Sequence, residues 1–276
     1  MKIYPKTSLQ DMSEEMNEIN RNSEGMELQF FHEKDIADEF NFENLIRKRK
    51  KEFPNLKEII VHPPLSNYNI ELLVFKNKEL IAKQLTKLVE LSKELNIKLC
   101  INYHTYWTKE QYRASGLADI IKEYLKIIEN TDVIMLIENL YMILDEKDSC
   151  SVIDICKYID HPNLRACIDT THVHCKANIY KKDFNTMIHQ EFNKEDCEKY
   201  VKQIHFAAAL DNDGYIKKQT HGRKHESYES LKEELAWLEE YGMKDKIYVT
   251  EVSEEDYFTR VDQIEEIKML QKAIQE

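Results

Sequence analysis

Seven short apolar runs in this 276-residue chain each end in a residue that can bind a metal ion. The runs are 27–32 (ELQFFH), 58–62 (EIIVH), 99–104 (LCINYH), 133–138 (VIMLIE), 164–169 (LRACID), 201–205 (VKQIH) and 247–251 (IYVTE). Runs of this length are typical of buried parallel strands. If all these strands are parallel, their last side chains gather at one edge of the sheet. Imidazoles and carboxylates collected in this way are the ligands of a site for several metal ions.

Amphipathic helix patterns follow the strand runs in regular alternation. The predicted helices are 9–22, 38–53, 78–95, 108–129, 149–159, 181–200, 228–241 and 261–275. Each has apolar residues three and four positions apart with lysines and glutamates between them. With a weak first strand at 2–8, the chain contains eight strand-helix units. This pattern predicts an α/β protein with a single (β/α)8 TIM-barrel domain over 1–276, whose site lies at the carboxyl ends of the strands.

An open, doubly wound sheet would also produce alternating strands and helices. That fold normally carries a glycine-rich phosphate loop after its first strand. This chain has five glycines and none near the first turn, which favours the barrel. The weakest element is the first strand, because Pro5 cannot donate a hydrogen bond to a neighbouring strand.

The composition limits the kind of protein and its location. The formal net charge of −12 and the lack of an obvious basic stripe argue mildly against binding to nucleic-acid backbones. No apolar stretch approaches the roughly 20 residues of a membrane span, and residues 1–6 lack an apolar signal core. The six cysteines form no CxxC pair. We therefore expect a cytoplasmic protein with free thiols and no membrane partner.

The histidines fall into two classes by position. His32, His161 and His189 are expected to be ordinary hydrogen-bonded residues, because a lone histidine is more often that than a ligand. The other candidates form a set at strand ends or just beyond them: His62, His104, His172, His205 and His225, together with Glu138, Asp169 and Glu251. Carboxylates that close apolar strands are costly to bury without a cation or partner. We expect Glu138, Asp169, His205 and Glu251 to bind metal together.

Several short motifs in this set resemble a known family. IEN at 137–139, CIDTTH at 167–172, QIH at 203–205 and VTE at 249–251 resemble the metal-binding strands of the xylose isomerase-like TIM-barrel superfamily. Within it the chain is most similar to endonuclease IV, the AP endonuclease family 2. VHPPL at 61–65 resembles that family's VHAPY, NYH at 102–104 matches its next histidine-bearing strand, and DTTH at 169–172 resembles its DTCH. The resemblance extends over nearly the whole barrel.

The resemblance implies three divalent metal ions. His62, His104 and Glu138 would hold the first ion, and Glu138, Asp169, His205 and Glu251 would hold the second, with Glu138 bridging. His172 and His225 would hold the third. Zinc suits imidazole and carboxylate ligands best, and manganese or iron is an alternative.

The chain departs from the family pattern at the third ion. Arg223, Lys224 and His225 stand where the family has Asp-Arg-His, and Ala208 replaces a further aspartate. His221, Asp211 or Asp213 could substitute; otherwise we expect two tightly bound ions. Leu65 and Ser66 replace the dipeptide that the family inserts into DNA, so we expect a small phosphorylated or sugar substrate rather than duplex DNA. We expect Arg223, Lys224 and Lys218 to bind phosphate, and Tyr106 and Trp107 could stack on the substrate.

Several functions remain open from the sequence. The leading hypothesis is a phosphoesterase in which a metal-bridging hydroxide attacks the substrate. The second is a sugar or sugar-phosphate isomerase or epimerase that needs one metal and uses Glu138 and Glu251 as acid and base; it leaves His62 and His104 without a role. A non-catalytic metal-bound scaffold is a third reading, although no protein partner is evident. Oxidative chemistry on a di-iron site is also compatible with these ligands.

Overall fold

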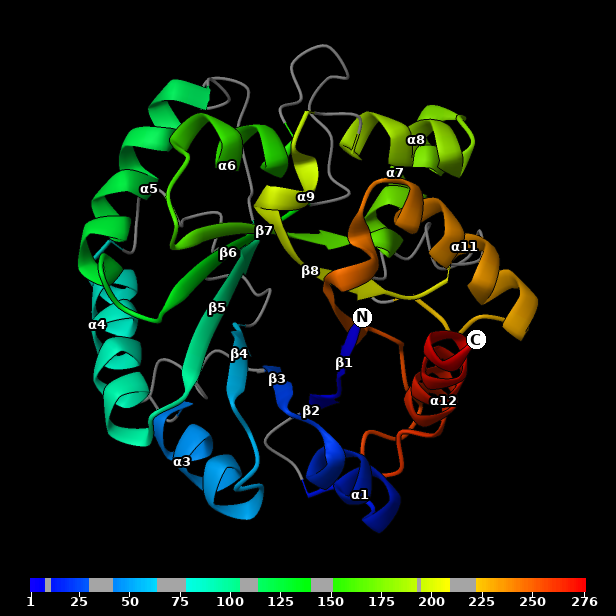
Figure 1. Cartoon of the computed structure of the whole chain (residues 1–276), viewed down its shortest axis with the longest axis horizontal. Helices are drawn as coiled ribbons and strands as arrows, with labels where there is room; N and C mark the ends of the chain where they lie inside the picture. The colour runs from blue at the N-terminus through cyan, green and yellow to red at the C-terminus, as the bar shows by residue number, and fades with distance from the viewer. Residues whose placement is uncertain are drawn as a thin grey trace.

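The computed structural model describes residues 1–7, 11–29, 42–63, 78–104, 114–139, 151–192, 195–208 and 222–276. Within these residues the chain forms one sheet of nine parallel strands, surrounded by helices (Figure 1). The strands are β1 (Lys2–Tyr4), β2 (Lys6–Thr7), β3 (Gly25–Gln29), β4 (Glu58–His62), β5 (Lys98–His104), β6 (Ile134–Glu138), β7 (Leu164–Asp169), β8 (Val201–Phe206) and β9 (Ile247–Thr250). Their order in the sheet is β1-β9-β8-β7-β6-β5-β4-β3-β2.

The first strand consists of two segments that flank Pro5 and close the barrel. Before the proline, β1 pairs with β9, and after it β2 pairs with β3. The carbonyl oxygen of Pro5 accepts a hydrogen bond of 2.9 Å from the backbone N–H of Glu27. The proline lacks a donor of its own, so it lies where the strand changes partner. The predicted TIM barrel is confirmed, with its weak first strand at the seam.

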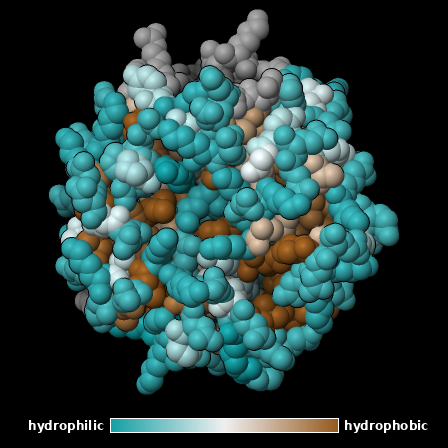
Figure 2. Space-filling view, viewed as in Figure 1, coloured by the Kyte–Doolittle hydropathy of each residue, from teal (hydrophilic) through white to brown (hydrophobic). Residues whose placement is uncertain are grey.

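The helices alternate with the strands and form the outer ring of the barrel (Figure 1). They are α1 (Glu14–Asn22), α3 (Phe42–Glu52), α4 (Lys78–Leu95), α5 (Ala114–Ile128), α6 (Val152–Ile159), α7 (Thr170–Tyr180), α8 (Phe184–Phe192), α9 (Cys197–Tyr200), α11 (Tyr228–Glu240), the 3-10 helix η2 (Met243–Asp245) and α12 (Val261–Gln275). The face of the molecule seen in Figure 2 is mainly hydrophilic, with apolar patches between the hydrophilic side chains. None of the helices described is long and apolar enough to cross a membrane.

Two predicted helical segments differ from the structure. Residues 170–180 form α7 directly after β7, where no helix was predicted. The predicted helix at 181–200 contains two separate helices, α8 and α9. The predicted strand at 27–32 is Gly25–Gln29 in the structure, and His32 lies outside the described residues.

Alternating side chains along the strands fill the barrel interior in layers. On β4, Glu58, Ile60 and His62 are two positions apart, so they point the same way at successive heights. The middle height contains a buried apolar group to which Ile60, Leu136 and Val249 belong. The strand register places His62 opposite Gln29, His104 opposite Glu138 and Asp169 opposite His205 at the carboxyl-terminal height. The polar candidates therefore lie together at one end of the barrel, with these apolar residues beneath part of the cluster.

The amino-terminal end of the barrel contains a separate ion pair between the buried Glu58 and the partly buried Lys202. Lys202 Nζ lies 2.7 Å from Glu58 Oε1, and the Tyr4 hydroxyl donates to Glu58 Oε2 over 2.9 Å. Tyr4 lies against Gly25, where a Cβ would come within 2.3 Å of the tyrosine ring. A glycine is needed at this position because the ring occupies the space of its side chain.

Candidate metal centre

Seven side chains at the carboxyl ends of six strands form what we call the strand-end cluster. They are His62, His104, Glu138, Asp169, His172, His205 and Glu251. All seven are buried, with exposed fractions of 4% or less. His62, His104, Glu138 and Asp169 are the last residues of their strands, and Glu251 directly follows β9. The structure thus brings together seven of the eight predicted metal ligands.

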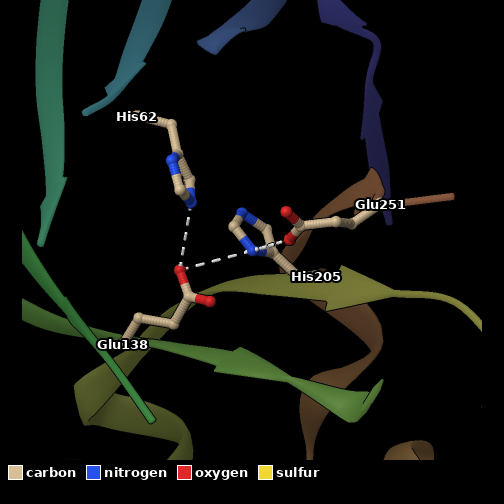
Figure 3. A group of neighbouring side chains, drawn as sticks. All are labelled: His62, Glu138, His205 and Glu251. Carbon is tan, nitrogen blue, oxygen red and sulfur yellow. Dashed lines mark ion pairs between the residues drawn. The ribbon is translucent and has the colours of Figure 1, made fainter. Parts of the chain in front are cut away.

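Glu138 lies among several histidines of the cluster. Its Oε1 is 3.2 Å from His104 Nε2 and 3.6 Å from His172 Nδ1. Its Oε2 is 3.6 Å from His62 Nε2 and 3.4 Å from His205 Nδ1 (Figure 3). Both oxygens of one carboxylate therefore face imidazole nitrogens, which is the arrangement expected of a carboxylate that serves two cations.

His205 joins Glu138 to Glu251. Its Nδ1 lies 2.5 Å from Glu251 Oε2 as well as near Glu138, and the three side chains point toward a common region (Figure 3). The strands β6, β8 and β9 each contribute one of these side chains. Their convergence follows from the parallel sheet, because each is at or next to the carboxyl end of its strand.

Asp169 and His172 are positioned by the start of α7. Asp169 is the N-cap of this helix, and its Oδ1 accepts hydrogen bonds from the backbone N–H groups of Thr171 and His172. This cap leaves Oδ2 pointing to the cluster, 3.2 Å from His172 Nδ1. Asn139 fixes the neighbouring strand ends, since its Oδ1 accepts from the N–H of Asp169 over 2.7 Å and its carbonyl oxygen lies 2.8 Å from His172 Nδ1.

The potential ligand atoms form two groups, each with all its atoms within 4.8 Å of one another. One group contains His62, Glu138, His205 and Glu251, and the other contains Glu138, Asp169 and His172. Glu138 belongs to both. The grouping divides the ligands differently from the resemblance, which implied that His62 and His104 share an ion.

The cluster has the donor chemistry of a cation site. His62 Nδ1 lies 3.0 Å from the carbonyl oxygen of Pro63, so this nitrogen carries the proton and Nε2 presents a lone pair. His62 Nε2 and Asp169 Oδ2 are buried and lack a hydrogen-bond partner among the described residues. Buried polar atoms are normally paired. The residues present therefore fit a divalent metal ion.

The electrostatics of the cluster also favour added positive charge. Burial and the nearby carboxylates of Glu251 and Glu138 together raise the pKa of Asp169 to about 8. Burial alone would raise the pKa of Glu138 too, but His104 and His205 outweigh it and lower that pKa well below its usual range. Burial lowers the pKa of His172 to about 4 and also lowers that of His62. Neutral imidazole is the form that binds metal. Burial would lower the pKa of His205 as well, but Cys167 and the carboxylates of Glu251, Glu27 and Glu138 raise it well above its usual range.

A polar layer that was not predicted lies beneath the strand-end cluster. Glu27 Oε2 is 2.8 Å from His205 Nε2, and Gln203 Nε2 donates to the same oxygen. Lys6 Nζ donates to Glu251 Oε1 and lies 3.2 Å from Glu27 Oε1. Lys6 and Glu27 are almost fully buried. Glu27 lies inside an apolar run, and a buried carboxylate requires a partner, which is the signal that could have identified it.

The other predicted site residues do not belong to the strand-end cluster as the structure describes it. His225 Nδ1 lies 2.5 Å from Glu266 Oε1, and its Nε2 lies 3.2 Å from Glu234 Oε2. Lys224 Nζ lies 2.8 Å from Asp262 and also contacts Glu265, both on α12. The side chain of Arg223 is half-exposed, with a nitrogen 3.7 Å from Glu226. Tyr106, Trp107, Lys218 and His221 lie outside the described residues.

Of the three histidines expected to be ordinary, His161 and His189 lie within the described residues and make ordinary contacts. His161 Nδ1 accepts a hydrogen bond of 3.1 Å from the N–H of Asn163. His189 Nδ1 lies 2.8 Å from the Tyr241 hydroxyl on the protein surface. Each therefore has a local hydrogen-bond partner.

Comparison with known proteins agrees with this architecture. The family model described as xylose isomerase-like TIM barrel matches residues 22–272. No curated protein sequence matches the chain. Similar solved structures share the fold at low sequence identity.

Endonuclease IV from Thermus thermophilus is 12% identical, with a TM-score of 0.59, over 98% of this chain and 99% of that one. A D-tagatose 3-epimerase-like protein is 17% identical, with a TM-score of 0.61, over 100% and 97%. The IOLI protein, solved with a zinc atom, is 14% identical, with a TM-score of 0.64, over 99% and 96%. The same fold thus occurs in a nuclease and in an epimerase-like protein.

Proposed function

Because this chain belongs to the xylose isomerase-like TIM-barrel family, we propose that it is a metal-dependent phosphoesterase with two cations at the strand-end cluster. The observation that carries this proposal is the position of Glu138, which belongs to both groups of potential ligands. A carboxylate shared in this way is the usual bridge of a two-metal hydrolytic site.

The ligands of each cation follow from the two groups. His62, His205 and Glu251 would hold one ion with Glu138, and Asp169 and His172 would hold the other with the same glutamate. His104, whose Nε2 is 3.2 Å from Glu138 Oε1, would orient the bridge or add a ligand. When bound, the two ions supply Lewis acidity that polarises the phosphoester and activates water.

The residues of this chain hold that chemistry in place. Asn102 donates to Glu138 Oε2, which restricts the rotation of the shared carboxylate. The Asp169 cap and Asn139 fix the ends of β6 and β7. Rigid ligands reduce the reorganisation that binding and reaction would otherwise require.

The charge of the site favours an anionic substrate only when two cations are present. Glu27, Glu138, Asp169 and Glu251 are four carboxylates, and Lys6 is one ammonium. Two divalent cations would leave one net positive charge, which suits a phosphodiester. A single divalent cation would leave one net negative charge and repel it. A small phosphorylated molecule is the substrate class that we propose.

A sugar isomerase or epimerase is the alternative function. It is favoured by the contact of Glu138 and Glu251 with one nitrogen of His205, at 3.4 and 2.5 Å. The two carboxylates face a common region, as an acid and a base on either side of a substrate carbon would. This reading needs one cation and assigns no role to His62.

Metal content separates the two functions. Elemental analysis of protein saturated with Zn²⁺ or Mn²⁺ and then dialysed should give two ions per chain, and the loaded protein should hydrolyse bis(4-nitrophenyl) phosphate. One ion per chain, together with epimerisation of free ketoses and no hydrolysis, would replace the phosphoesterase with the epimerase. Metal-free protein is the control for both assays.

A further inference from the structure

Lys6 and Glu27 form a buried ion pair inside the barrel, directly beneath the strand-end cluster. Lys6 is in β2 and Glu27 in β3, and their side chains lie 3.2 Å apart. Lys6 is 3% exposed and Glu27 is fully buried. Burying two charges costs free energy, so such a pair is weak evidence for stability alone. Its contacts with the cluster point to another role.

Glu27 determines which nitrogen of His205 faces the cluster. His205 Nε2 lies 2.8 Å from both Glu27 Oε2 and Gln203 Nε2, whereas Nδ1 faces Glu251 and Glu138. A histidine that donates one ring N–H to a carboxylate presents the lone pair of its other nitrogen. Glu27 therefore favours the tautomer with the proton on Nε2 and Nδ1 open to a cation.

Lys6 orients the second carboxylate of the same group. Its ammonium donates to Glu251 Oε1, while Glu251 Oε2 lies 2.5 Å from His205 Nδ1. The carboxylate is thus held by one oxygen from below and directs the other toward the cluster. Because Lys6 also contacts Glu27, one ammonium couples the orientation of Glu251 to that of His205.

We propose that Lys6 and Glu27 are positioning residues that set the His205 tautomer and the Glu251 orientation for cation binding. The proposal rests on the proposed metal-dependent function. Neither residue would contact substrate or cation itself. Partners of this kind commonly change metal affinity by about 10- to 100-fold.

The barrel contains a matched control pair at its other end. Glu58 is buried like Glu27 and pairs with the partly buried Lys202, at 2.7 Å. The described partners of Glu58 are Tyr4, Cys100 and Lys202, none of which belongs to the strand-end cluster. A loss of buried charge pairing can therefore be separated from a loss of ligand positioning.

The experiment compares Glu27→Gln with Glu58→Gln. Zn²⁺ affinity of the metal-free proteins is measured by competition with a chromophoric chelator, and their stability by urea unfolding. Glu27→Gln should raise the dissociation constant by about 10- to 100-fold, while Glu58→Gln should lower stability and leave the affinity close to that of the wild type. Equal affinity in wild type and Glu27→Gln would overturn the proposal.

A second readout reports the tautomer itself. In the zinc-loaded wild type, ¹H–¹⁵N spectra of the imidazoles should place the His205 proton on Nε2, and Glu27→Gln should weaken this preference. If Glu27→Gln does not fold, Lys6→Met and Lys6→Arg decide: arginine should recover affinity that methionine loses, and equal losses would overturn the proposal. A wild type that binds no divalent cation refutes the proposed function instead, so the two failures are distinct.

Discussion

His225 Nδ1 lies 2.5 Å from Oε1 of Glu266, and the backbone N–H of the same histidine donates to Glu266 Oε2 over 3.0 Å. The other ring nitrogen contacts Glu234 on α11. His225 therefore connects the segment that follows β8 to two outer helices. The resemblance implied a third metal ion at this histidine, and the structure gives both of its ring nitrogens carboxylate partners instead.

We predict that His225→Ala leaves the metal content at two ions per chain. The unfolding free energy should fall by about 3–5 kcal/mol, because Glu266 loses its buried cationic partner and Glu234 keeps only the contact with His174. Elemental analysis and urea unfolding measure the two effects. His189→Ala, which removes a surface hydrogen bond, is the control and should change neither quantity greatly. If His225→Ala loses a metal ion, His225 is a metal ligand after all, as the resemblance implied.

The same ion pair predicts a pH dependence of stability. Burial alone would lower the pKa of His225, but its hydrogen bonds with Glu234 and Glu266 prevail and raise it from 6.5 to about 9. Because the pKa is raised in the folded protein, the contribution of protonated His225 to the unfolding free energy is complete below pH 6.5. It is lost as the pH rises through about 9.

The measurement is the unfolding free energy of metal-free wild type minus that of His225→Ala across this range. The difference should shrink with rising pH by about 3 kcal/mol. A difference that stays constant, or grows with pH, would show that His225 is neutral in the folded protein.

Glu138→Gln should remove both cations, because one carboxylate serves both groups of ligands. The amide keeps the size of the side chain but loses its charge, so we expect less than a tenth of the wild-type activity and metal content. Elemental analysis after dialysis, with circular dichroism to verify folding, measures the effect. A folded variant that retains two ions would exclude the shared role of Glu138.

Two single substitutions should each remove one ion. His62 belongs to the group with His205 and Glu251, whereas His172 belongs to the group with Asp169. We expect about one ion per chain from either His62→Ala or His172→Ala, and near none from the double variant. His161→Ala is the control, since its ring binds the local backbone. If His62→Ala keeps two ions, the first group is not a metal site.

Strands and helices with one regular hydrophobic pattern were predictable from the sequence. The strands Glu58–His62 and Leu164–Asp169 and the helices Lys78–Leu95 and Val261–Gln275 match their predicted ranges. Each strand is a short run that ends in a polar residue, and each helix has one apolar side. The helix α7 was missed because both its polar and its apolar residues are buried, so it lacks the single apolar stripe of a surface helix.

The site was predictable only in part, because some of its contacts form across the closed barrel between residues far apart in the sequence. The metal-candidate residues follow apolar strands, so their shared position was visible in the sequence. Glu27 and Lys6 lie within or beside strands, and their roles depend on partners across the barrel. Glu27 and His205 are 178 positions apart. A contact of this kind arises from closure of the barrel, which no local pattern reports.

The interrupted first strand has a consequence for how this protein is made. Lys6 and Glu251, which meet at the seam, are 245 positions apart. A nascent chain therefore releases β1 and β2 from the ribosome long before β9 exists to pair with β1. Until then the incomplete barrel has open strand edges, which are prone to aggregate. Lysine and proline hinder wrong edge pairing, so the Lys2–Lys6 segment that closes the barrel also protects the unfinished protein.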